Sequence, residues 1–220
     1  MSDPRRAFGD ETLKAFVAHL SSAEPIPGGG SAAAVGASLA AALVAMVASL
    51  SRDRPTYAPY VASIERCDAE GRRLAARCLA LADEDAAAYG RFAAVMKMPR
   101  ETDAEKEART AALGEAATVA AQVPLQVVLA CREIAAAAEE LAGRSNRNAA
   151  SDLGVAAHFS VAAAHSAAEN VRVNLPSVPD RALADDLEFR TEEALADVER
   201  IARAVRAVVA SGSLREPVVG

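Results

Sequence analysis

The sequence predicts an all-α fold, and its composition carries most of that prediction. Alanine occupies 56 of the 220 positions, and alanine has the highest intrinsic helix propensity of all residues. Aromatic residues make up only 4% of the chain and tryptophan is absent, whereas a sheet-rich domain favours β-branched and aromatic residues. We therefore expect an alanine-rich, single-domain bundle of about six helices with one long central helix.

The charge and the hydrophobic content exclude other classes of protein. A hydrophobic fraction of 52% with a net charge of −6 excludes a disordered chain. The isoelectric point near 5.2 argues against a nucleic-acid-binding protein. No repeat or linker divides the chain, so we expect one domain over residues 1–220 with its core at about 10–205. Because small side chains bury little area each, a homo-oligomer is a reasonable hypothesis.

The first two helices are expected over residues 10–21 and 31–51. The first carries an apolar stripe at helical spacing, formed by Leu13, Phe16, Val17 and Leu20. Pro25 and Pro27 interrupt the chain after it. Ser31 is a residue type that caps helices, so it could begin the second helix.

Two longer helices are expected next, over residues 60–96 and 102–142. Apolar residues recur at helical spacing along the first, and a proline follows it. The second opens on Thr-Asp-Ala-Glu, which resembles a capping box. Pro124 should kink or break this helix, and Gly143 suits its C-terminal cap.

The last two helices are expected to end near residues 173 and 211. Residues 144–152 form either a loop or the start of a helix that Asn148 or Ser151 caps. Two prolines stop that helix, and Asp180 begins the last one.

The stretch Ile26–Ser51 contains no charged residue and is long enough to span a bilayer. Most of it is alanine, glycine and serine, it begins with a proline-glycine loop, and no aromatic belt flanks it. We therefore favour a buried central helix over a membrane span. The uncharged run Leu153–Ala168 contains histidine and serine and is still less typical of a membrane helix.

The expected location is cytoplasmic. Arg5 and Arg6 precede no apolar run, so no signal peptide is predicted. Three cysteines, an odd number, fit a reducing compartment. Cys67 and Cys78 are eleven residues apart on one helix face and are expected to pack in the interior.

Three glycines, Gly28, Gly29 and Gly30, precede Ser31. Such a run is entropically unfavourable, but it allows a ligand to approach the backbone closely. The helix that follows offers free N–H groups to an anion or a polar ligand. No lysine follows as in a P-loop, and no strand precedes as in a Rossmann fold. A tight turn between two touching helices is the alternative explanation.

Asp85 is the acidic residue that helical spacing places toward the core. Leu81 and Phe92 share its stripe, whereas Asp83 and Glu84 suit a solvated acidic run. A buried carboxylate requires a partner or a function. The spacing alone leaves a catalytic and a solvated Asp85 both open.

A third group of candidates is rich in asparagine and consists of Asn146, Asn148, Ser151, Asp152, Asn170 and Asn174. Carboxamides supply both donors and acceptors, which suits an amide-rich heterocycle such as a pterin. Asn170 and Asn174 are four residues apart and share one helix face. Caps and turns explain Asn148 and Asn174 equally well.

No metal site is expected. His158 and His165 could line one face of a helix, but no acid or cysteine stands near them at metal-ligand spacing. We interpret both as histidines packed within the fold.

These motifs, in this order, resemble the cyclodeaminase/cyclohydrolase family over about residues 10–205. The resemblance rests on Pro27-Gly28-Gly29-Gly30-Ser31, Asp85-Ala-Ala-Ala-Tyr89, Met98-Pro99-Arg100, Glu105-Lys106-Glu-Ala-Arg109, Val123-Pro124-Leu125, Asn146-Arg-Asn148-Ala-Ala-Ser151-Asp152 and Asn170-Val-Arg-Val-Asn174. The family includes the cyclodeaminase domain of formiminotransferase-cyclodeaminase and bacterial methenyltetrahydrofolate cyclohydrolases. It is all-helical and homodimeric, and we expect both properties here.

The resemblance implies one-carbon chemistry on a tetrahydrofolate substrate, without a metal or a redox cofactor. Asp85 matches the catalytic aspartate of the family and would act as general base and acid. The resemblance places the glycines and Ser31 against the folate, and it assigns the pterin to Asn146, Asn148, Ser151 and Asp152. Asn170 and Asn174 are further candidates. Lys106 or Arg109 would meet the glutamate carboxylates of the substrate.

Three functions remain open at this point. We favour hydrolysis of 5,10-methenyltetrahydrofolate to 10-formyltetrahydrofolate, because the whole chain resembles the stand-alone bacterial enzymes. The alternative is a cyclodeaminase that converts 5-formiminotetrahydrofolate to 5,10-methenyltetrahydrofolate and ammonia. A helical protein that binds folate without turnover is the third.

Overall fold

The computed structural model describes residues 7–218, and within them it contains six α-helices and no β-strand. The helices are α1 (Leu13–Leu20), α2 (Gly29–Ser51), α3 (Val61–Met96), α4 (Asp103–Leu141), α5 (Ala150–Asn174) and α6 (Arg181–Ser211). The all-α prediction is therefore confirmed. The ends of the predicted domain, including Arg5 and Arg6, lie outside the described residues.

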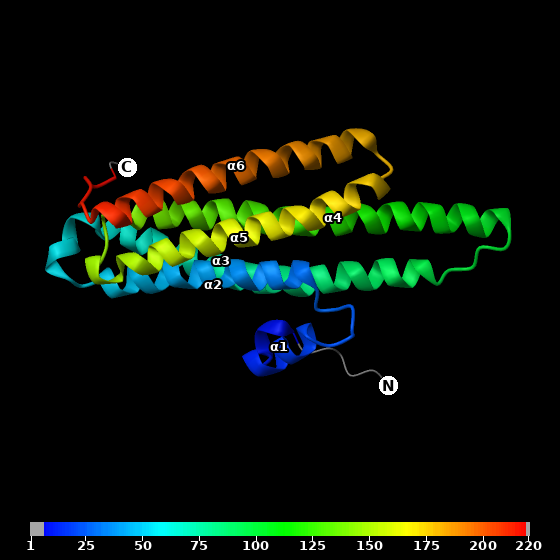
Figure 1. Cartoon of the computed structure of the whole chain (residues 1–220), viewed down its shortest axis with the longest axis horizontal. Helices are drawn as coiled ribbons and strands as arrows, with labels where there is room; N and C mark the ends of the chain where they lie inside the picture. The colour runs from blue at the N-terminus through cyan, green and yellow to red at the C-terminus, as the bar shows by residue number, and fades with distance from the viewer. Residues whose placement is uncertain (1–6, 219–220) are drawn as a thin grey trace.

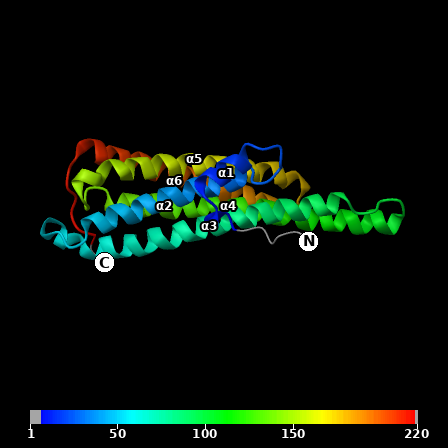
Figure 2. The same ribbon diagram turned by 90° about the horizontal axis from the view of Figure 1, so that it is seen from below.

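The helices form an elongated bundle in which α2 packs against α3, α4 and α5 (Figure 1). α6 covers α4 and α5. The outer ends of α3 and α4 extend beyond the other helices in both views, and we call this projection the arm (residues 93–113; Figures 1 and 2). α1 lies outside the bundle, alongside the N-terminal half of α2 (Figures 1 and 2).

Small residues let α2 approach its neighbours closely. Ala34, Ala37 and Ala41 are completely buried. A Cβ atom at Gly71 of α3 would lie 2.8 Å from the backbone nitrogen of Ala45, so that crossing requires glycine. The prediction of a packed central helix is confirmed.

Two helices, α2 and α4, are long and apolar enough to cross a membrane by length and composition alone. About half of each apolar window, 56% and 50%, is buried within the bundle. Core helices of soluble proteins pass the same test, so their length and composition are weak evidence for a membrane span.

The α4 helix continues through Pro124, so the break that the sequence allowed is absent. A proline has no N–H to donate to the carbonyl oxygen four residues earlier, which here belongs to Ala120. The Asn174 side chain donates to that oxygen at 3.1 Å and replaces the missing bond. The capping box at the start of α4 is present as expected, and Gly143 has the left-handed conformation (φ 73°) that suits a helix end.

Before α5 the structure follows the loop alternative, because residues 144–146 are irregular, residues 147–149 form a 3-10 turn and α5 begins at Ala150. Asn146, rather than Asn148 or Ser151, caps that turn, because its side chain accepts a hydrogen bond from the Asn148 N–H at 3.1 Å. The interpretation of His158 and His165 as packed was wrong, because both are exposed. The buried side of α5 is built from alanines together with Leu153, Ser160 and Val171. The cysteines are free thiols in the interior, as expected.

Candidate functional site

A cavity of about 340 Å³ opens where the glycine segment meets α3, α4 and α5. It is lined by Pro25, Ile26, Gly28, Gly29, Gly30, Asp85, Ala88, Tyr89, Phe92, Ala120, Asn170, Val173 and Asn174. The start of α2, the C-terminal third of α3, the middle of α4 and the end of α5 therefore meet at one point. Five of the residues singled out from the sequence lie there together, besides the catalytic candidate: the three glycines, Asn170 and Asn174.

Asp85 is half-buried in this cavity and faces the beginning of α2. The Ser31 Oγ lies 3.0 Å from Asp85 Oδ2 and 3.1 Å from the carbonyl oxygen of Ala82. The hydroxyl carries one proton and donates to one of the two acceptors at a time. Burial raises the pKa of the Asp85 carboxyl above its ordinary value, while hydrogen bonds from the side chain and backbone of Ser31 oppose that rise.

The first turn of α2 explains why the predicted cap was wrong. The helix begins at Gly29 after the N-cap residue Gly28, whose own side chain offers no acceptor. Ser31 is the third helical residue, and its hydroxyl lies 3.0 Å from the Asp85 carboxylate of α3. A carboxylate is stabilised at a helix N-terminus by the free N–H groups and the helix dipole. The Asp85 carboxylate therefore lies at the start of α2, and Ser31 contacts it through its hydroxyl instead of capping the helix.

Gly30 is required by the position of Asp85. A Cβ atom at residue 30 would lie 2.1 Å from Asp85 Oδ1 and 2.6 Å from Asp85 Cγ. A Cβ at Gly29 would meet only the Asn170 Nδ2 at an ordinary 3.9 Å. The second of the two helical glycines thus lets the carboxylate reach the helix start.

The two asparagines of α5 form the wall of the cavity opposite α3. Asn170 Nδ2 donates to the Ser166 carbonyl oxygen at 2.9 Å, and Asn174 Nδ2 donates to the carbonyl oxygens of Asn170 (2.7 Å) and Ala120 (3.1 Å). Their side-chain oxygens accept no hydrogen bond from the described residues, so they remain available to a polar ligand.

Tyr89 and Phe92 line the cavity but were not among the predicted site residues. The sequence analysis named Tyr89 only as part of a motif and Phe92 only as part of an apolar stripe. They lie four and seven positions after Asp85, the spacing that repeats one helix face. Tyr89 is 44% exposed. Two aromatic rings beside a carboxylate suit a flat heterocycle, and the i, i+4, i+7 spacing from Asp85 was the signal that could have identified them.

The other four members of the asparagine-rich group, Asn146, Asn148, Ser151 and Asp152, lie at the opposite end of the bundle from the cavity. Asn146 is buried, with its Nδ2 donating to the Leu50 carbonyl oxygen at 3.2 Å and its N–H donating to the Ser51 Oγ at 2.8 Å. Asn148, Ser151 and Asp152 follow at the start of α5. A single chain therefore does not bring these four residues to Asp85.

Arg109 lies on the arm, also outside the cavity. Its Nη2 is 3.4 Å from the Met96 Sδ, and its buried Nε has no hydrogen-bond partner among the described residues. Eleven helical residues separate Arg109 from Ala120 at the cavity, a distance of about 16 Å along α4. Its predicted contact with the substrate carboxylates stays a prediction.

A family model described as formiminotransferase-cyclodeaminase matches residues 12–193 of the chain. The chain belongs to the formiminotransferase-cyclodeaminase family. The chain is 37% identical over 205 residues to methenyltetrahydrofolate cyclohydrolase of Methylorubrum extorquens, covering 91% of this chain and 99% of the relative.

Two further members of the formiminotransferase-cyclodeaminase family extend the comparison. Formimidoyltransferase-cyclodeaminase of Rattus norvegicus is 31% identical over 198 residues, which is 90% of this chain but 37% of that longer protein. The crystal structure of formiminotetrahydrofolate cyclodeaminase from Thermotoga maritima has a TM-score of 0.82 and 28% identity. The match covers 92% of this chain and 98% of the Thermotoga maritima chain.

Within the described residues of this family member, no three histidine, cysteine, aspartate or glutamate side chains form a cluster that could hold a metal ion. The chemistry that the cavity supports is that of one carboxylate beside hydrogen-bonding groups and aromatic walls.

Proposed function

We propose that this protein hydrolyses 5,10-methenyltetrahydrofolate to 10-formyltetrahydrofolate, with Asp85 as general base and acid. The observation that carries the proposal is the half-buried Asp85 carboxylate, held by Ser31 at the edge of a cavity with aromatic walls. The 37% identity to a methenyltetrahydrofolate cyclohydrolase over nearly the whole length of both chains supports this choice of reaction.

The reaction requires one proton acceptor close to the bridging carbon. Water attacks the carbon between N5 and N10 of the substrate, and Asp85 accepts a proton from that water. The tetrahedral intermediate then loses its bond from carbon to N5 as the formyl carbonyl forms. Asp85 returns a proton to N5, and the hydroxyl proton of the intermediate leaves to solvent. A raised carboxyl pKa favours this second step, because the carboxyl then holds the proton that it accepted until N5 can take it.

The bridged substrate carries a positive charge shared by its two nitrogens. A carboxylate in a partly desolvated site attracts such a cation more strongly than one in water does. The side-chain oxygens of Asn170 and Asn174 would accept hydrogen bonds from the N–H groups of the pterin, and Tyr89 and Phe92 would pack against its ring. No metal or redox cofactor is needed in this scheme, and we propose that it operates in the cytoplasm.

A cyclodeaminase activity is the second candidate, and the identity to cyclodeaminases from Rattus norvegicus and Thermotoga maritima favours it. There, N10 of 5-formiminotetrahydrofolate attacks the formimino carbon, Asp85 accepts the N10 proton, and ammonia departs after receiving it. Only the nucleophile and the leaving group differ from the hydrolysis.

The deciding experiment offers both substrates to the purified protein. We expect the absorbance of 5,10-methenyltetrahydrofolate to fall faster with protein than without it, and ammonia release from 5-formiminotetrahydrofolate tests the second activity. Folate binding without turnover of either substrate would contradict both catalytic proposals and favour the non-catalytic folate-binding protein.

A further inference from the structure

Ser31 lies next to Asp85 but outside the lining of the cavity. Its side chain is completely buried, and it is not among the residues that line the cavity. Its Oγ lies 3.0 Å from Asp85 Oδ2 and 3.1 Å from the carbonyl oxygen of Ala82, both on α3. A ligand in the cavity therefore meets Asp85 and not Ser31, so an effect of Ser31 on the reaction has to pass through Asp85.

A second serine of α2 shows what such a hydroxyl does when no carboxylate is near. Ser38 lies seven residues after Ser31, and its Oγ donates at 2.9 Å to the carbonyl oxygen of Ala75, seven residues before Ala82. The two serines therefore occupy equivalent positions on antiparallel helices, about two helical turns apart. Of the two, Ser31 alone has a carboxylate as a second acceptor.

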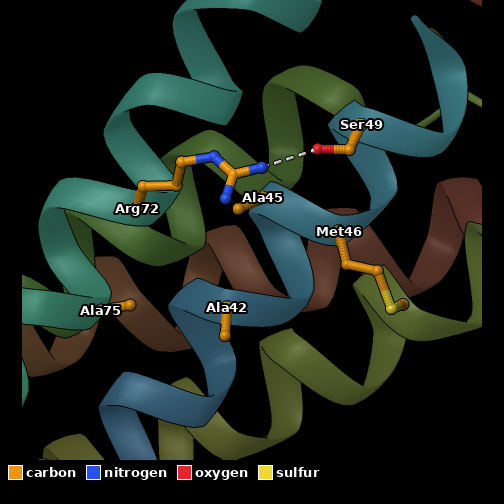
Figure 3. Close-up of a pocket in the computed structure, with 6 residues that line it drawn as sticks. All are labelled: Ala42, Ala45, Met46, Ser49, Arg72 and Ala75. Carbon is orange, nitrogen blue, oxygen red and sulfur yellow. Dashed lines mark hydrogen bonds between the residues drawn. The ribbon is translucent and has the colours of Figure 1, made fainter.

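A third serine of α2 contacts a carboxylate of a different kind. Ser49 donates to Asp68 of α3 at 3.0 Å, beside a hollow of about 490 Å³ in which Arg72 donates to Ser49 (Figure 3). Arg52 and Arg72 both form ion pairs with the Asp68 carboxylate. Two cations therefore neutralise Asp68, and the serine adds one bond to a network of ion pairs that joins two helices.

The surroundings of Asp85 contain no such cation. The α2 helix has no charged residue, and the segment before α2 and the walls from α4 and α5 contribute only uncharged side chains to the cavity. Tyr89, on α3 itself, is the other titratable residue of the lining, and Asp83 and Glu84 bond to other partners. Burial raises the pKa of the Asp85 carboxyl, and the Ser31 hydroxyl is the side chain that opposes this rise.

The Ser31 hydroxyl can serve both protonation states of Asp85 while every heavy atom stays in place. Asp85 Oδ1 accepts no hydrogen bond from a side chain of the described residues, so it is free to take a proton from the reacting molecule. While Asp85 is ionised, Ser31 donates to Oδ2, because a charged acceptor forms the stronger hydrogen bond. Once Oδ1 is protonated, Oδ2 loses its charge, and the Ser31 proton can turn to the Ala82 oxygen at 3.1 Å. The Ser31 proton rotates and is not transferred.

We propose that Ser31 is a positioning residue whose hydroxyl turns between Asp85 and the Ala82 carbonyl as Asp85 loses and gains the catalytic proton. Ser31 holds the carboxylate at the start of α2 in one orientation and makes no contact with the folate. The inference rests on the function proposed for the cavity, because it gives Ser31 a task in the proton transfer of Asp85.

The first test separates kcat from KM. Ser31→Ala removes the hydroxyl with little change in volume, and we expect it to lower kcat about tenfold while KM stays within about twofold, because the hydroxyl acts on Asp85 and not on the folate. Ser38→Ala is the matched control, since it loses the equivalent bond to a carbonyl, and it should keep both constants. A raised KM with an unchanged kcat in Ser31→Ala would indicate a substrate contact and overturn the proposal.

The second test is the dependence of kcat/KM on pH, which a purely structural role would not alter. Without the Ser31 hydroxyl, burial acts on Asp85 with less opposition, so the acidic inflection should move up by about one pH unit in Ser31→Ala. Ser31→Thr keeps a hydroxyl and should return the inflection to its wild-type position. If Ser31→Thr does not fold, as judged by circular dichroism, Ser31→Cys takes its place and should give an intermediate shift, because a thiol is a weaker donor. An inflection that stays in place in Ser31→Ala would refute the role of Ser31.

The third test does not depend on turnover. The NMR signal of the Asp85 side-chain carboxyl carbon, identified by its loss in Asp85→Asn, reports the pKa of that group directly. We expect this pKa to rise in Ser31→Ala and to stay unchanged in Ser38→Ala. A protein that shows the rise but turns over neither folate would refute only the proposed function. A protein that turns over a folate but shows no rise would refute only the task of Ser31.

Discussion

Asn174 donates a hydrogen bond to the carbonyl oxygen of Ala120, the acceptor that Pro124 leaves without a partner in α4. The same side chain lines the cavity beside Asp85. One residue therefore bonds the acceptor that Pro124 leaves open in α4 and joins α4 to the end of α5 at the candidate site. The Asn174 side chain therefore both stabilises the fold and lines the cavity.

This relationship predicts coupling between Asn174 and Pro124. Asn174→Ala should lower the free energy of unfolding by about 1 kcal/mol, because a partly buried carbonyl loses its donor. In a Pro124→Ala background the same change should cost less, since the new backbone N–H can bond to Ala120. A double-mutant cycle by urea denaturation at fixed protein concentration measures the difference, and strictly additive effects would contradict this explanation.

The Asp85→Asn variant should lose activity while keeping its fold. We expect kcat/KM to fall by about 10² to 10⁴, the usual contribution of a general acid–base group. In the wild type, activity should rise with pH through an inflection above the ordinary carboxyl pKa of 3.8, because the base must be ionised and burial raises its pKa. Rate profiles against pH for the wild type and the variant test whether Asp85 is the group that titrates. If the residual activity of Asp85→Asn shows the same inflection at acidic pH, the inflection belongs to another group.

The same substitution should stabilise the protein at neutral pH. A carboxyl whose pKa is raised in the folded state binds protons more tightly there than in the unfolded chain. The free energy of unfolding therefore falls as the pH rises from the unfolded to the folded pKa. Thermal melts should show a higher Tm for Asp85→Asn at pH 7 and no gain at acidic pH. Glu84→Gln, which alters an exposed carboxylate bonded to Arg77, is the control and should give no such gain.

Gly30→Ala should abolish activity more completely than it lowers stability. Its Cβ would overlap the Asp85 carboxylate at 2.1 Å, so either Asp85 or the start of α2 must move. Gly36→Ala on the same helix, with a Cβ 3.9 Å from that of Ala163, should retain activity. Steady-state kinetics of the two variants provide the comparison, and a fully active Gly30→Ala would show that the contact is not needed.

The ion-pair cluster at Asp68 should contribute to stability where a surface pair does not. Asp68 is 6% exposed and accepts hydrogen bonds from Ser49 Oγ and Arg72 Nε, both at 3.0 Å, as well as from Arg52. Asp68→Ala should lower the free energy of unfolding by about 2 kcal/mol, because it removes charged hydrogen bonds that join α2 to α3. Asp103→Ala breaks a pair whose acid is fully exposed and should change the denaturation midpoint little.

Helix ends are predicted well from the sequence where a residue begins or ends the helix in which it lies. The ends of α3, α4 and α6 follow from capping residues, prolines and glycines, and the structure agrees with them to within about two residues. The errors involve residues whose partner is distant in sequence. Pro124 was expected to kink or break a helix, and the acceptor that it leaves open is bonded by Asn174, 50 positions away. Ser31 was a candidate cap for its own helix, but its hydroxyl contacts Asp85 of α3 instead.

The site shows the same division between local and tertiary information. Composition alone determined that this chain forms closely packed helices, because small side chains favour helix formation and allow near approach. Helical spacing determined that Asp85 lies on a core-facing stripe with Phe92. Only the tertiary structure decided that Gly30 leaves room for Asp85, and that Asn148, Ser151 and Asp152 lie at the far end of the bundle. Spacing along a chain fixes which face of a helix a residue occupies, but the packing of helices fixes which residues meet.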